Sequence, residues 1–124
     1  MSIDARIQQE WATWKYYVMS RSQQQYNDIR QLFSGNQWSP QKDAQFHSLL
    51  EEAQRTNPTL GSLRNAYQHV WGYFKRVATA DEKKVFQQTL ASLTLTRDEV
   101  APLLRNLATH YQIDYLQQSK LLFP

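Results

Sequence analysis

The sequence predicts an all-α fold, a single compact bundle of about five helices that forms one domain over residues 1–124. Apolar residues recur every three or four positions along most of the chain, which is the spacing of a helix with one buried face. The alternation of apolar and polar residues that is typical of a half-buried strand is missing. Serine, threonine and proline also stand directly before several apolar runs, as they do in the first turn of helices.

The first predicted helix covers residues 3–33 and ends at the Ser-Gly-Asn sequence of residues 34–36. Arg21 projects onto its apolar stripe, although a guanidinium rarely lies in a core without a partner. Three explanations are open: the helix bends near residues 20–22, Arg21 emerges beyond the end of the core, or Arg21 faces a ligand or a buried acid. We favour the bend or the emergence. The stripe consists of Ile3, Ile7, Trp11, Trp14 and Val18.

The second helix begins with Ser39 as N-cap and Pro40 at the first helical position. It is expected to stop near residues 56–58, where a proline ends the run. Its apolar residues are Phe46, Leu49, Leu50 and Ala53. Trp38, which follows a Gly-Asn loop, could be exposed, whereas the other tryptophans are expected in the core.

The third helix is predicted over residues 59–77 and has two unlike faces. At about 100° per residue, its apolar face comprises Leu60, Leu63, Tyr67, Val70, Trp71, Phe74 and Val77. The opposite strip comprises Asn65, His69, Gly72 and Arg76. A glycine inside a helix costs about 1 kcal/mol relative to alanine. Gly72 is therefore either the floor of a groove that a phosphate or a base approaches, or a position where another helix packs or glycine is merely tolerated.

Two more helices and a short tail helix complete the prediction. Thr79 and Glu82 form a capping box that begins a fourth helix with the apolar residues Val85, Phe86, Leu90 and Leu93. Residues 96–99, Thr-Arg-Asp-Glu, predict a second capping box that begins a fifth helix with Val100, Leu103, Leu104, Leu107 and Tyr111. Pro102 lies inside this pattern and predicts a kink or a late start. In the tail after Asp114, a short helix is expected over Tyr115 and Leu116.

Composition restricts the class of protein. The 124 residues are 41% hydrophobic and include four Trp, seven Tyr and five Phe, which suffices for one core. Cysteine is absent, so this chain forms no disulfide and supplies no thiolate to a nucleophile, a zinc or an iron–sulfur cluster. The formal net charge of +3 favours anionic partners mildly. No apolar run approaches the roughly 20 residues that span a bilayer, and the N-terminus is too polar for a secretory signal. We therefore expect a cytoplasmic protein without a membrane partner.

Two stretches of the chain lack acidic residues. There is no Asp or Glu between residues 53 and 80, or between residues 11 and 27. If the first and third helices are neighbours, these stretches form one basic surface. The cations expected to contact phosphates are Lys15, Arg21, Arg64, Lys75 and Arg76. A base or ribose would be contacted by His69 and Tyr73, with Tyr73 as a stacking ring.

Other chemistries find little support in the sequence. His47, His69 and His110 fall on different predicted helices, so a metal site would need tertiary convergence. The chain has neither a nucleophile elbow nor a glycine-rich phosphate loop, and no helix-turn-helix pattern that reads DNA. We expect no catalytic residue, no metal and no cofactor.

Two patterns resemble a known family. Residues 14–26 contain a K-x-x-x-M-x-x-S-x-x-x-Y pattern, matched by Lys15, Met19, Ser22 and Tyr26. Residues 65–76 contain a Q-H-x-x-G-Y-F-K pattern, matched by Gln68, His69, Gly72, Tyr73, Phe74 and Lys75. In this order, and with similar stretches at residues 100–107 and 115–124, they resemble the YbgA-like bacterial domain family, a family of unknown function. Its members often have histidine where Trp14 and Arg21 stand here, so no role of those histidines is carried over.

The resemblance implies an accessory role. The family's domain occurs alone or fused to a cysteine-rich iron–sulfur domain similar to thiouracil desulfidases, and the fusions imply a contribution to binding thiolated tRNA. Because this chain has no cysteine, desulfuration would need a separate desulfidase-like iron–sulfur enzyme as partner.

Two functions of different classes follow. The preferred one is a non-catalytic RNA-binding accessory module, for tRNA or another RNA, which recognises shape and stacks bases. The alternative is a helical protein–protein interaction or dimerisation module, whose surface would be apolar rather than basic. An enzyme is a distant third, and the sequence leaves the oligomeric state open.

Overall fold

The computed structural model describes residues 3–124, and this part of the chain is all-helical. It contains seven α-helices and one short 3-10 helix rather than about five helices. Their bounds are α1 Ala5–Arg21, α2 Gln23–Leu32, η1 Ser34–Asn36, α3 Pro40–Arg55, α4 Leu60–Trp71, α5 Ala80–Ala91, α6 Val100–His110 and α7 Asp114–Gln117. None of the helices in the described part is both long and apolar enough to cross a bilayer.

The helix predicted over residues 3–33 is broken at Ser22, which has an extended backbone (φ −163°, ψ 118°). The Ser22 amide still donates to the carbonyl of Val18 (2.9 Å), while its hydroxyl accepts from the amide of Gln25 (3.1 Å) and begins α2. One residue therefore ends α1 and caps α2. The break confirms the bend expected near residues 20–22, and the prediction of one continuous helix was wrong.

The bend also accounts for Arg21. Its guanidinium donates to the backbone carbonyl of Thr56 at the end of α3 (2.9 Å). It also lies 4.7 Å from the centroid of the Tyr17 ring. Arg21 is partly exposed, so its charge is held by a carbonyl and an aromatic face at the edge of the core.

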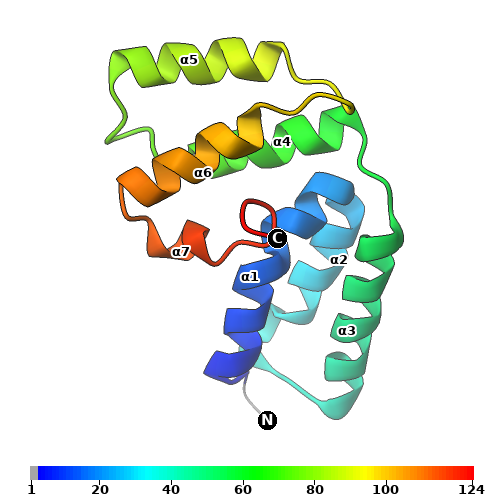
Figure 1. The fold of residues 1–124 in the computed structure, drawn as a ribbon. Coiled ribbons are helices and arrows are strands. Elements are labelled where there is room, and N and C mark those ends of the chain that lie inside the picture. The colour runs from blue at the N-terminus through cyan, green and yellow to red at the C-terminus, as the bar shows by residue number, and fades with distance from the viewer. Residues whose placement is uncertain (1–2) are drawn as a thin grey trace.

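Helix α1 separates two groups of helices (Figure 1). On one side, α1, α2 and α3 enclose the buried residues Ile7, Val18, Ile29, Trp38, Phe46, Leu50 and Ala53. On the other side, Tyr16 and Met19 of α1 join a larger cluster with buried residues of α4, α5, α6 and the C-terminal segment. The chain returns to α1 at its end, where the Lys120 amide donates to the carbonyl of Thr13 (2.9 Å). Both faces of α1 are thus covered by different parts of the chain.

Trp38 is buried, with only 4% of its surface exposed, so the idea that it could be exposed was wrong. Gly35 and Asn36 adopt positive φ angles of 80° and 52° in η1, a conformation that glycine and asparagine tolerate best. The chain turns back there, and the Trp38 ring packs 4.8 Å from Phe33 and 6.1 Å from Phe46, measured between centroids.

Helix α4 ends at Trp71, six residues before the predicted end. Residues 72–77 form successive turns, in which the amides of Gly72, Tyr73 and Phe74 donate to carbonyls three residues earlier (2.9–3.1 Å). Because these turns are tighter than an α-helix, the predicted apolar face is lost there. Phe74 remains fully buried, whereas Val77 is 49% exposed.

The capping box at Thr79 and Glu82 is confirmed, with both reciprocal hydrogen bonds present (2.8 and 3.1 Å). The predicted second box was wrong, because α6 begins at Val100 and Asp98 caps it. The Asp98 carboxylate accepts from the amides of Val100 (2.9 Å) and Ala101 (3.1 Å) and from the hydroxyl of Tyr67. Pro102 therefore lies in the first turn, where no backbone donor is needed, which confirms the late start.

Candidate nucleic-acid interface

Helices α1 and α4 lie side by side, which is the condition for joining the two acid-free stretches. The hydroxyl of Ser62 on α4 donates to the carbonyl of Ser20 on α1 (2.7 Å). One turn further along α4, the side-chain amide of Asn65 donates to the side-chain carbonyl of Gln23 at the start of α2 (2.9 Å). Asn65 is therefore partly covered, while His69, Gly72 and Arg76 of the same predicted strip are exposed.

Four side chains from three segments of the chain meet, and we call them the tyrosine–lysine cluster: Lys15, Tyr16, Tyr73 and Tyr115. The hydroxyls of Tyr16 and Tyr73 are 3.1 Å apart and share a hydrogen bond. The rings of Tyr73 and Tyr115 are nearly parallel, at 5.7 Å and 16°. The ammonium of Lys15 lies 5.4 Å from the Tyr16 ring centroid and 5.6 Å from that of Tyr115. The cluster thus joins α1, the turn after α4, and α7.

One tyrosine of the cluster is buried and the other two are exposed. Tyr16 is only 7% exposed, whereas Tyr73 and Tyr115 are 36% and 37% exposed. Burial, and then the hydrogen bond to Tyr73, raise the pKa of Tyr16 well above its ordinary value. The Tyr16 hydroxyl therefore stays neutral, and its hydrogen bond holds the exposed ring of Tyr73 in place. What reaches solvent is a stacked pair of rings beside a lysine.

A hollowed surface follows the end of α4 and the turn after it, partly against α5, and we call it the α4–α5 groove. It consists of three adjoining hollows of about 190, 330 and 360 Å³, and Lys75 lines all of them. Its floor contains Trp71 and Phe86, whose rings stack at 4.4 Å and 6°. Among the residues that the structure describes, no Asp or Glu lines these hollows. The remaining lining residues are Gln68, His69, Gly72, Ala78, Lys83, Gln87 and Leu90.

A family model described as "Protein of unknown function (DUF1722)" matches residues 15–124. The chain belongs to the DUF1722 family. The match contains every residue of the tyrosine–lysine cluster and of the α4–α5 groove. A search of the curated proteins and a search of the solved structures each found no matching relative.

The fold of this DUF1722 domain brings together some of the predicted site residues and separates others. Lys15 and Tyr73 belong to the cluster, and His69 and Lys75 line one hollow of the groove. Arg21 follows Lys15 by six residues, which rotates it by about 120° around α1, and it contacts Thr56 instead.

Arg64 and Arg76 belong to neither of these sites. Arg64 is half-buried on α4, and Arg76 is exposed on the turn after it. In the described part of the chain, neither lines the groove.

The structure shows a role for Gly72 that the sequence did not indicate. It is the C-cap of α4 rather than an interior residue. A Cβ atom placed on it would lie 3.0 Å from the carbonyl oxygen of His69. A side chain at this position would crowd the end of α4, and its absence in glycine leaves the hollow beside His69 and Lys75 open.

Sequence reasoning missed Tyr16, Tyr115 and Lys83 as members of these sites. Each lies on a predicted helix, and its helical period assigns it only to a face of that helix. Tyr115 is 42 residues from Tyr73 in the chain, so their stacking depends on how α7 returns to α1 and α4.

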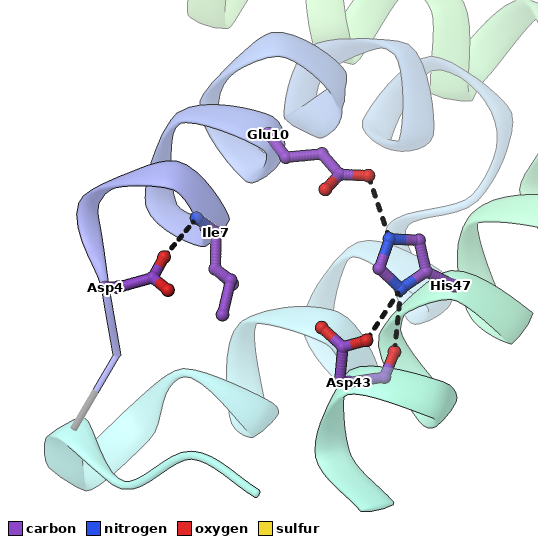
Figure 2. Close-up of polar contacts among 5 residues, drawn as sticks. All are labelled: Asp4, Ile7, Glu10, Asp43 and His47. Atoms are coloured by element: carbon purple, nitrogen blue, oxygen red, sulfur yellow. Dashed lines mark hydrogen bonds and ion pairs between the residues drawn. The ribbon is translucent and has the colours of Figure 1, made fainter. Parts of the chain in front are cut away.

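A separate group of polar side chains joins α1 and α3 (Figure 2). His47 on α3 is placed between Glu10 of α1, at 2.9 Å from Nε2, and the backbone carbonyl of Asp43, at 2.9 Å from Nδ1. The Asp43 carboxylate is 3.5 Å from Nδ1. In the same view, the Asp4 carboxylate caps α1 by accepting from the amide of Ile7 (2.9 Å).

Both nitrogens of His47 face acceptors, so the doubly protonated imidazolium satisfies them best. The hydrogen bond to the Asp43 carbonyl is the main cause that raises the pKa of His47, burial opposes it, and Glu10 adds to the rise. The group links α1 to α3. Among the described residues, no three His, Asp or Glu side chains are arranged to hold a metal ion.

Proposed function

We propose that this DUF1722 domain is a non-catalytic RNA-binding module, with tRNA as its RNA, and that it is of the YbgA-like kind. The observation that supports the proposal is the tyrosine–lysine cluster beside a groove lined by lysines. Three segments far apart in the sequence supply an exposed aromatic pair and the cations next to it.

This arrangement has the two components that RNA binding needs. Exposed rings stack unpaired bases for about 1–3 kcal/mol per base, and lysines neutralise phosphates with release of counterions. In our proposal Lys15 and Lys75 contact phosphates, while Tyr73 stacks a base and His69 donates to a base or ribose. Arg64 and Arg76 supply outer phosphate contacts, and Arg21 orders the end of α3.

The module is an accessory rather than a desulfidase. An iron–sulfur cluster is held by cysteine thiolates, and this chain contains no cysteine. We therefore place the removal of sulfur from a thiolated nucleoside in a separate desulfidase-like enzyme, to which this domain contributes RNA binding.

A binding assay tests the proposal. Labelled tRNA should bind at about 50 mM salt, and affinity should fall steeply toward about 200 mM. The variant Arg64→Ala/Lys75→Ala/Arg76→Ala should weaken binding. A control that removes three exposed cations elsewhere, Arg6→Ala/Arg30→Ala/Arg97→Ala, changes the net charge equally and should weaken it less. Absence of binding at low salt, with no effect of the first variant, would refute the proposal.

One observation favours the alternative, a protein-interaction module. Helices α2 and α3 border a hollow of about 560 Å³ lined by Asp28, Leu32, Ala44, Gln45, Ser48 and Leu49. Most of the exposed lining of this hollow is apolar, which suits an apolar side chain of a partner protein. A partner that a pull-down retains with the native chain and loses with a Leu32→Glu/Leu49→Glu variant would support this function. A purely monomeric state in light scattering, with no partner retained by the native chain, would count against it.

A further inference from the structure

The tyrosine–lysine cluster and the α4–α5 groove adjoin across one tight turn. Tyr73 and Lys75 are two residues apart in the turn at residues 72–77, so their Cα atoms lie within about 7 Å of each other. Tyr73 contacts Tyr16 and Tyr115, whereas Lys75 lines the groove with Lys83. A chain-like ligand that crosses the turn would meet aromatic rings on one side and ammonium groups on the other.

The cations are too few for a duplex-binding surface. Lys15, Lys75 and Lys83 are the lysines of the cluster and groove, and the whole chain has a formal net charge of only +3. Affinity for duplexes comes mainly from many phosphate contacts. A surface with three lysines needs a second source of affinity, and the exposed rings of Tyr73 and Tyr115 supply it.

Those rings can stack only on bases that are not already stacked in a helix. Bases of a double strand have both faces covered, so aromatic side chains recognise single-stranded loops, bulges and ends. The groove next to them is lined by lysines and by the amides of Gln68 and Gln87. Lys75 and Lys83 can neutralise the phosphates of a single sugar–phosphate backbone there.

We propose that this domain holds an unpaired RNA strand across the turn at residues 72–77. One base stacks on the Tyr73–Tyr115 pair, beside the ammonium of Lys15, and the adjacent phosphates lie in the α4–α5 groove at Lys75 and Lys83. This inference rests on the proposed RNA-binding function and specifies which part of the RNA is bound.

Fluorescence anisotropy with the full chain tests the choice of strand. The probes are an unstructured RNA of about 12 nucleotides, a blunt RNA duplex of the same length, and tRNA, all at about 50 mM salt. We expect the unpaired RNA and tRNA to bind, and the duplex to bind at least tenfold more weakly. Equal affinity for the duplex would overturn the inference and leave RNA binding intact, whereas no binding to any probe would refute the proposed function itself.

Variants of the rings test the stacking contact. Tyr115→Leu should lower affinity for the unpaired RNA by about tenfold and leave duplex affinity unchanged. Tyr115→Phe keeps the ring and should restore the affinity, which separates stacking from an effect of the hydroxyl. If Tyr115→Leu shows native helicity by circular dichroism and binds normally, the stacking assignment is wrong.

A pair of neighbouring lysines tests the groove. Lys83 lines it, whereas the adjacent Lys84 does not, and both are exposed on α5. Lys83→Gln should reduce the slope of log affinity against log salt by about 0.7, the value for one phosphate contact with a single strand. Lys84→Gln removes the same charge and should leave the slope unchanged. Equal slopes for the two variants would place the phosphates outside the groove.

Discussion

Removing the hydroxyl of Tyr73 should destabilise this protein more than removing that of Tyr16, although Tyr73 is the exposed partner. Their hydroxyls share one hydrogen bond of 3.1 Å. Tyr16 is 7% exposed and Tyr73 is 36% exposed. Tyr73→Phe therefore leaves a buried hydroxyl without a partner, whereas Tyr16→Phe leaves an exposed hydroxyl that water can solvate.

The magnitudes follow from this asymmetry. A buried polar group that loses its partner costs about 1–3 kcal/mol, whereas the net value of a satisfied hydrogen bond is about 1 kcal/mol. Tyr73→Phe should therefore lower the free energy of unfolding by about 2 kcal/mol and Tyr16→Phe by about 1 kcal/mol or less. At roughly 4 °C per kcal/mol for a chain of this size, the two melting temperatures should differ by about 4 °C.

The assay is urea denaturation followed by tryptophan fluorescence, with circular dichroism as a second probe of the same transition. The double variant removes both hydroxyls and should be no less stable than Tyr73→Phe alone, because the buried orphan group is gone. The two effects would then be coupled by at least the loss that Tyr16→Phe causes alone. Strictly additive effects, or a larger loss for Tyr16→Phe, would refute the reasoning.

Three further predictions concern stability. The pKa of His47 is raised, chiefly by its hydrogen bond to Asp43. Its stabilisation is therefore complete below the unfolded pKa of about 6.5 and is lost as pH rises through the higher folded pKa. Because His47 and Glu10 are 46% and 37% exposed, denaturation curves should show that less than about 1 kcal/mol of stability is lost as pH rises above about 6.5, and this loss should be absent in His47→Gln. Ser22→Ala should cost about 1 kcal/mol and Ser22→Gly a few tenths; equal losses would contradict the capping role. Phe74→Ala should cost about 3–5 kcal/mol, whereas Val77→Ala, on the predicted same face, should change stability by less than about 0.5 kcal/mol.

Local hydrogen bonds explain which helix ends could be predicted. Ser39, Thr59 and Thr79 each accept a hydrogen bond from the amide three residues later, and such contacts need no other part of the fold. The predicted capping box at residues 96–99 failed for a tertiary reason. Asp98 is held by the hydroxyl of Tyr67 on α4, and its carboxylate caps α6 from there.

The core was predictable only where the helical period continues. On α4 the predicted apolar residues Leu63, Tyr67 and Val70 are buried, because a regular helix keeps them on one face. The period fails after Trp71, where tighter turns expose Val77. It also gives no information about Trp38, whose burial depends on the reversal at Gly35.

The candidate site shows the same division. Its residue types were visible in the sequence, since Lys15, His69, Tyr73 and Lys75 lie in stretches without acids. Arg21 lies in such a stretch as well, but a rotation of about 120° from Lys15 around α1 directs it to Thr56.

By itself, the sequence determined that the chain is helical, where most helices begin, and which residues supply positive charge and aromatic rings. Those properties depend on spacing along the chain and on hydrogen bonds between near neighbours. Only the tertiary structure decided that Lys15, Tyr73 and Tyr115 meet, and that Lys75 and Lys83 share one groove. The meeting of Lys15, Tyr73 and Tyr115 joins segments far apart in the chain, because α1 is covered on one face by α4 and the C-terminal segment. Lys75 and Lys83 are close in sequence, but they lie on different elements, so their shared groove depends on how α5 packs beside the end of α4.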